Sequence, residues 1–140
     1  MKQTIYILFV LFAFFKPTAS VRQQSIRVTG TLKCGDRPAS NVHVKLWDED
    51  DGPDRDDVLA DKETDSNGYF DMEGSAHELL TIDPVLKIYH DCDDALLGQR
   101  KVKFLIPTKY ITVGSHAKKP FNIGVLNLET IFPGEERKIL

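Results

Sequence analysis

The stretch Asp83-Pro84-Val85-Leu86-Lys87-Ile88-Tyr89-His90-Asp91-Cys92 decides the fold. We interpret it as a strand that begins at a proline, and successive side chains of a strand point to opposite faces. One face carries Leu86, Ile88 and His90, and the other carries Val85, Lys87, Tyr89 and Asp91. Cys92 ends the strand and can pair within the chain only with Cys34, because the sequence has two cysteines. Such a disulfide would join this strand to the start of the domain.

The N-terminal residues have the pattern of a secretory signal peptide. Lys2 is a basic start, residues 5–15 are all apolar or aromatic, and Thr18-Ala19-Ser20 offers the small residues that a signal peptidase recognises. This run is too short for a membrane anchor, which needs about 20 apolar residues. We therefore expect residues 1–20 to be a signal peptide cleaved after Ser20. The product would be secreted and extracellular, with one domain over residues 21–140 and no transmembrane segment.

The charge balance excludes one class of partner. The chain has 18 basic and 21 acidic residues, and residues 1–20 include Lys2 and Lys16 but no acid, so cleavage changes the net charge from −3 to −5. Proteins that bind nucleic acid are usually basic. We therefore expect no nucleic-acid partner.

Alternating apolar and polar residues predict seven or eight short strands in residues 21–140. The predicted strands span 25–33, 41–47, 58–64, 69–72, 83–92, 99–106, 110–114 and 121–128. Asp65-Ser66-Asn67-Gly68 is a strong hairpin-turn signal, residues 74–81 are expected to form a helical turn or an irregular link, and residues 133–140 are expected to fray. No helical period is sustained, so the pattern favours an all-β sandwich.

The two cysteines predict one disulfide. An oxidising compartment favours a bond between Cys34 and Cys92, which would stabilise the fold by about 4 kcal/mol in the chain-entropy treatment. The alternative is a pair of free thiols or metal ligands. His90 and Cys92 are two residues apart, but no second Cys/His cluster accompanies them.

No spacing of residues indicates a catalytic site. The four histidines, His43, His77, His90 and His116, form no known motif with a serine, a cysteine or an acid, and there is no phosphate-binding loop. We expect His43 to be a solvated strand residue and His90 a buried one that is hydrogen-bonded to a neighbour. The sequence therefore predicts neither an enzyme nor a cofactor.

The segment 48–65 is strongly acidic and raises the question of calcium. Hard cations prefer carboxylate oxygens, and the weak candidates for ligands are Asp48, Asp50 and Asp51. Their spacing does not follow the EF-hand pattern. The alternative is a solvated acidic surface, which also limits aggregation at a sheet edge.

The segment 95–128 has the opposite character, because it contains no acid at all. Its cations form a candidate ligand-binding patch: Arg100, Lys101, Lys103, Lys109, Lys118 and Lys119. Such a patch attracts phosphates or anionic lipid head groups at about 1 kcal/mol per cation, although it would also serve as an ordinary solvated face. If the patch binds an anion, replacing Arg100, Lys101 and Lys103 by Glu should abolish binding without unfolding the domain.

Residues along nearly the whole of 21–140 resemble the nematode transthyretin-like family. The matching segments are Val28-Thr29-Gly30-x-Leu32-x-Cys34, Pro38-x-x-Asn41-Val42-x-Val44-Lys45-Leu46-Trp47-Asp48, Thr64-Asp65-x-x-Gly68-x-Phe70, Ile82-Asp83-Pro84-x-Leu86-x-Ile88-Tyr89-His90-Asp91-Cys92, Ile106-Pro107-x-x-Tyr110-Ile111 and Phe132-Pro133-Gly134-Glu135. Their order and spacing make the resemblance specific. It implies a secreted transthyretin/prealbumin-like sandwich of two four-stranded sheets.

The sequence departs from the family at a second cysteine pair. Many members carry this pair, but residues 97–100 and 137–140 of this chain contain no cysteine. The departure supports pairing Cys34 with Cys92 and predicts a looser C-terminal tail. The ending Arg137-Lys138-Ile139-Leu140 also differs from the Tyr-Arg-Gly-Ser ending of the hydroxyisourate hydrolases related to transthyretin.

The resemblance also suggests a function. Members of the family include secreted factors implicated in recognising phosphatidylserine on dying cells and bridging it to an engulfment receptor. We therefore expect a secreted, non-enzymatic recognition or bridging factor at cell surfaces, with a role in apoptotic cell clearance or neuroprotection, and with a cell-surface receptor or an anionic lipid head group as partner. The alternatives are an oligomeric carrier of a small apolar ligand and a calcium-binding extracellular module. The sequence leaves the oligomeric state open.

Overall fold

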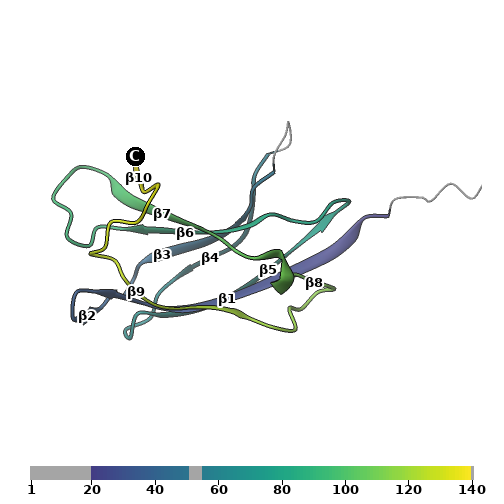
Figure 1. Ribbon diagram of the computed structural model, residues 1–140, viewed down its shortest axis with the longest axis horizontal. Helices are drawn as coiled ribbons and strands as arrows, with labels where there is room; N and C mark the ends of the chain where they lie inside the picture. Colours follow the sequence, from purple (N-terminus) through teal and green to yellow (C-terminus); the bar gives the residue numbers. More distant parts are fainter. Residues whose placement is uncertain (1–19, 51–54, 140) are drawn as a thin grey trace, which may run out of the picture.

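Two β-sheets pack face to face in the computed structural model, which describes residues 20–50 and 55–139 (Figure 1). The predicted signal peptide therefore lies outside the described residues except for Ser20. Within these ranges, no helix has the length and apolar character required to cross a membrane.

The first sheet is built around its longest strand. Its strands are β1 (Arg22–Cys34), β2 (Arg37–Pro38), β5 (Tyr69–Glu78), β8 (Thr112–Val113) and β9 (Phe121–Asn127). One edge of β1 pairs antiparallel with β5, and the other edge pairs antiparallel with β8 and parallel with β9. Ile26, Val28 and Leu32 of β1 are fully buried between the sheets, as the alternating pattern predicts.

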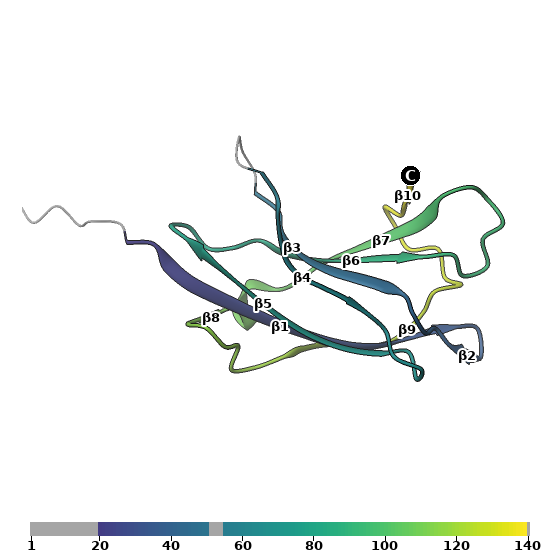
Figure 2. The same cartoon turned by 180° about the vertical axis from the view of Figure 1, so that it is seen from behind.

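The second sheet contains the stretch 83–92. Its strands, in spatial order, are β10 (Glu136–Lys138), β7 (Gln99–Leu105), β6 (Pro84–His90), β3 (His43–Asp48) and β4 (Asp57–Glu63). Seen from behind, β3 and β4 lie above β1 and β5 (Figure 2). Leu86 and Ile88 of the central strand β6 are fully buried in the core.

The disulfide joins the two sheets. Cys34, at the end of β1, is bonded to Cys92, two residues after β6, and their Cα atoms are 5.7 Å apart. The predicted β-sandwich with one disulfide is therefore confirmed. Each sheet has five strands instead of four, because β2 and β10 are very short additions that the alternating pattern does not reveal.

Two local predictions were wrong. Residues 74–78 continue β5, since they pair with β1 as far as Arg22↔Glu78. Tyr110, where a strand was expected to begin, is the last residue of a short 3-10 helix (Thr108–Tyr110), and the strand β8 is limited to Thr112–Val113. Strict alternation along β9 would place Val125 on the same face as Ile123, but Val125 is exposed, because the pairing with β1 shifts register between Thr29 and Thr31 beside Gly124, which has a positive φ of 79°.

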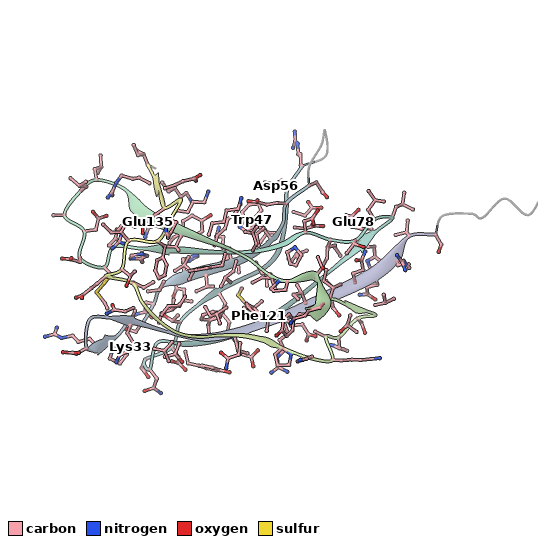
Figure 3. The ribbon with its side chains drawn as sticks, viewed as in Figure 1. Lys33, Trp47, Asp56, Glu78, Phe121 and Glu135 are labelled. Carbon is pink, nitrogen blue, oxygen red and sulfur yellow. A yellow bond between two sulfur atoms is a disulfide. The ribbon has the colours of Figure 1, made fainter. Side chains whose placement is uncertain are left out.

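The C-terminal segment is held against the sandwich mainly by Arg100. The guanidinium of Arg100 donates to the carbonyls of Cys92, Leu128 and Thr130 and forms two hydrogen bonds with the Glu135 carboxylate, at 2.5 and 3.0 Å. Glu135 is labelled in Figure 3. Arg100 is only 7% exposed, so it is part of the interior.

A second ion pair, between Arg137 and Asp94, orders the residues that follow Glu135. Arg137 donates to both carboxylate oxygens of Asp94 at 2.8 Å and also bonds to the carbonyls of Leu97 and Gly98. Residues Glu136–Lys138 then pair with β7. The prediction of a loose, frayed tail was therefore wrong, because the ion pairs fix this segment without a second disulfide.

Replacing Arg100 with Leu should destabilise the fold by about 3–5 kcal/mol, because Glu135 and three carbonyls would lose their buried partner. The free energy of unfolding in urea measures this loss. As a matched control, Lys101→Ala on the same strand removes an exposed ion pair with Glu136 and should cost at most about 1 kcal/mol. Equal losses in the two variants would contradict the structural role of Arg100.

Candidate functional site

The six cations of the predicted patch fall into three environments. Arg100 points into the sandwich, and Lys101 and Lys103 lie on the outer face of the second sheet. Lys109 and Lys119 lie over the Tyr110 ring, and the exposed Lys118 precedes Lys119 in the chain. The structure therefore does not bring them together into a single patch.

Arg100 is unsuited to binding an external anion. Its guanidinium is already occupied by Glu135 and three backbone carbonyls, and the Glu135 carboxylate raises the pKa of Arg100 further above its ordinary value. Replacing it by Glu would place two carboxylates in contact inside the protein. The expected charge reversal at Arg100 without unfolding is therefore wrong.

Lys101 and Lys103 are on the surface, but each contacts a carboxylate. The Lys101 ammonium lies 3.0 Å from Glu136, and Lys103 forms an ion pair with Glu49. These two lysines belong to a larger group of charges on the second sheet.

The remaining three lysines form what we call the Tyr110 corner, comprising Lys109, Tyr110, Lys118 and Lys119. The 3-10 helix Thr108–Tyr110 positions the ring, which packs edge-on against Phe121 with the ring centroids 4.8 Å apart. The ammonium groups of Lys109 and Lys119 lie 5.4 and 5.3 Å from the centre of the Tyr110 ring, within the range of cation–π attraction.

The Tyr110 corner is exposed and electrostatically unbalanced. Its three lysines are all exposed, and none makes an ion pair with a carboxylate of the described residues. The nearby Glu73 instead accepts a hydrogen bond from the Ala117 N–H and lies 3.5 Å from His116. The corner is therefore the most available cationic surface of the predicted set.

The acidic candidates do not form a cation site in the part of the chain that is described. Asp48 is fully buried, and its Oδ1 accepts the Asp83 N–H at 2.7 Å. Asp50 lines a hollow with residues 78–81, and its charge contributes to the raised pKa of Asp48; Asp51 is outside the described residues. No group of three or more His, Cys, Asp or Glu side chains in residues 20–50 and 55–139 is arranged to hold a metal.

His90 and His43 occupy the predicted kinds of environment. His90 is buried, and its Nδ1 accepts the Cys92 N–H at 3.1 Å. Burial, with the nearby Arg100 charge, lowers the pKa of His90, so the ring is neutral near pH 7. His43 is half-buried on the outer face of β3 and lies 3.2 Å from Asp61 and 3.3 Å from Glu63.

Fold and disulfide define a two-sheet sandwich of the transthyretin type, and comparison with known proteins identifies the family. The profile of the transthyretin-like family, described as TTR-52, matches residues 29–107. The chain belongs to this family.

Similar proteins are known in Caenorhabditis elegans. Transthyretin-like protein 46 is 57% identical over 94% of this chain and 74% of its own length. Transthyretin-like protein 33 is 48% identical over 95% of this chain and 92% of its own length, and transthyretin-like protein 5 is 44% identical over 84% and 85%. The prediction of a nematode transthyretin-like protein is confirmed.

The buried carboxyl group of Asp48 predicts a pH dependence of the free energy of unfolding. Burial raises the pKa of Asp48 from 3.8 to about 6, so the folded state retains a proton that the unfolded chain releases between these values. Asp48 therefore lowers stability as the pH rises from about 4 to about 6, by about 3 kcal/mol in all.

An Asp48→Asn variant should lack this loss. Its free energy of unfolding, relative to that of the unchanged protein, should increase by about 3 kcal/mol between pH 4 and pH 7. Urea unfolding at several pH values measures the difference, with the exposed Asp36→Asn as control. Parallel profiles for Asp48→Asn and the unchanged protein would contradict the assignment.

Proposed function

We propose that this protein is a secreted, non-enzymatic recognition or bridging factor that binds anionic lipid head groups, phosphatidylserine in particular, at cell surfaces. The observation that carries the proposal is the Tyr110 corner, with three exposed lysines that have no carboxylate partner among the described residues.

The geometry of the corner suits a charged membrane surface. Each lysine near an anionic bilayer contributes about 1 kcal/mol of attraction, so three acting together favour binding without a deep pocket. Tyr110 has an apolar ring and a polar hydroxyl, a combination suited to the boundary between lipid and water. Binding of this kind weakens as salt screens the charges.

Family membership and the predicted signal peptide support an extracellular setting. A protein that holds lipid at the Tyr110 corner leaves most of its surface available for a cell-surface receptor. Bridging of this kind would serve the clearance of apoptotic cells or the protection of neurons. Neither catalysis nor a cofactor is part of the proposal, because the histidines have structural roles or lie on the surface.

The two alternatives receive less support. A carrier of a small apolar ligand would require an oligomer that encloses an apolar channel. A calcium module would require several carboxylates around one point, whereas Asp48 is buried and bonded to the backbone.

The proposal predicts that the protein binds liposomes containing phosphatidylserine and not liposomes of phosphatidylcholine alone. Replacing Lys109, Lys118 and Lys119 together by Gln should reduce binding by at least about ten-fold, because roughly 3 kcal/mol of attraction is removed. Co-sedimentation with the liposomes measures the effect, with calcium present or chelated.

The matched control replaces Arg22, Arg37 and Arg55 by Gln, which removes the same charge from other exposed positions. This control should retain binding. Equal losses in the two triple variants would show a non-specific charge effect, and binding that ignores phosphatidylserine would reject the lipid ligand.

A further inference from the structure

Three lysines lie side by side across the outer face of the second sheet. Lys45 of β3 is directly opposite Lys87 of β6, and Lys87 is directly opposite Lys103 of β7. We call these three residues the lysine row. Neighbouring strands are about 4.8 Å apart, so the row is about 10 Å across. Like charges placed directly opposite one another destabilise a sheet, which makes this arrangement unusual for a purely structural surface.

The middle of the row is buried. Lys87 is 6% exposed, and its ammonium lies 4.3 Å from the centre of the Trp47 ring and 2.7 Å from Glu49. The second carboxylate oxygen of Glu49 contacts Lys103. The Glu49 carboxylate thus forms ion pairs with two ammonium groups. Figure 3 shows Trp47 with this sheet, in the layer opposite Phe121.

A hollow beside the row contains further cations and a second aromatic ring. Tyr89 lies next to Lys87 on the same face of β6, and the ammonium of Lys138 in β10 is 5.0 Å from the centre of its ring. Trp47, Lys87, Tyr89, Lys101, Glu136 and Lys138 are among the residues that line a hollow of about 470 Å³.

The face as a whole has an excess of positive charge. Its five lysines are Lys45, Lys87, Lys101, Lys103 and Lys138, and its carboxylates are Asp61, Glu49 and Glu136, in contact with these lysines, and Glu63, in contact with His43. The protein has a formal net charge of −3, so this local excess runs against the overall balance. Such an excess next to partly buried aromatic rings favours an anionic ligand with a flat body.

We propose that this hollow binds a six-membered ring carrying several sulfate or phosphate groups, and that Glu49 is an internal carboxylate displaced by the ligand. Oxyanions on such a ring are close enough together to reach two members of the lysine row at once, and ammonium groups bind them through charge-assisted hydrogen bonds. The ring itself would lie over Trp47 or Tyr89. This site is on the outer face of the second sheet and does not depend on the lipid site at the Tyr110 corner.

Trp47 gives a direct measurement, because it is the only tryptophan in the chain. The protein recovered from expression of the full chain is titrated with inositol hexakisphosphate and, separately, with a sulfated heparin tetrasaccharide, while Trp47 fluorescence is recorded. The proposal predicts a saturable change whose midpoint moves to higher concentration as salt is added. A response to the first ligand alone assigns a phosphorylated ring, and a response to the second alone assigns a sulfated one.

Substitutions distinguish a binding role of these residues from a purely structural one. A binding role predicts weaker ligand binding when a lysine is replaced and stronger binding when Glu49 is replaced. Lys87→Met and the more exposed Lys103→Gln should each weaken binding, Lys87→Met by at least about ten-fold. Glu49→Gln should strengthen binding several-fold, because the competing charge is removed. Lys109→Gln is the control and should leave the fluorescence titration unchanged. Thermal unfolding establishes that each variant is folded.

Two results would overturn the proposal. One is the absence of a saturable response to either ligand. The other is weaker binding in Glu49→Gln, or unchanged binding in folded Lys103→Gln, since the row would then be an internal ion-pair network and not a binding surface.

Discussion

The hydrogen bonds of Arg100 are the interaction on which the rest of the structure depends. Arg100 is the first cation of the acid-free segment 95–128, yet its guanidinium points inward to Glu135 and three carbonyls. This contact holds the segment from Leu128 to Glu135 against the sandwich. The strand β10 follows this segment directly and pairs with β7. The strand β10 then brings Lys138 over Tyr89. One buried ion pair thus shapes the outer face of the second sheet.

Because the Arg100 side chain points into the sandwich, the other cations of the segment 95–128 lie on two separate surfaces. Lys101 and Lys103 follow it on the outer face of β7, where they join lysines of β3, β6 and β10. Lys109, Lys118 and Lys119 lie beyond the end of β7, with Lys109 and Lys119 over the Tyr110 ring. Carboxylates partly neutralise the first surface, whereas the described carboxylates form no ion pairs with the lysines of the second. Two surfaces of different composition suit ligands of different shape.

Much of the fold could be predicted because it depends on local alternation. The two-sheet sandwich, the disulfide and the core face of β6 follow from period-two patterns and from a single available cysteine pair. The exposed position of Val125 could not be predicted, because the register shift beside Gly124 involves pairing with a strand that is distant in the sequence. The burial of Lys87 could not be predicted either. It depends on Trp47, in β3, and on Glu49, directly after β3, which both contact the Lys87 ammonium across the neighbouring strand. Nor did the sequence reveal that Arg100 would meet Glu135, because 35 residues separate them.

The central claim is that the two cationic surfaces are independent, and simultaneous binding tests it most directly. The protein is first saturated with phosphatidylserine liposomes, and the response of Trp47 fluorescence to the sulfated tetrasaccharide or to inositol hexakisphosphate is then recorded. Our account predicts the same midpoint with and without liposomes, because the Tyr110 corner and the lysine row involve different residues of different elements. Loss of the response in the presence of the lipid, or release of the protein from the liposomes by the soluble anion, would show one shared site and contradict the account.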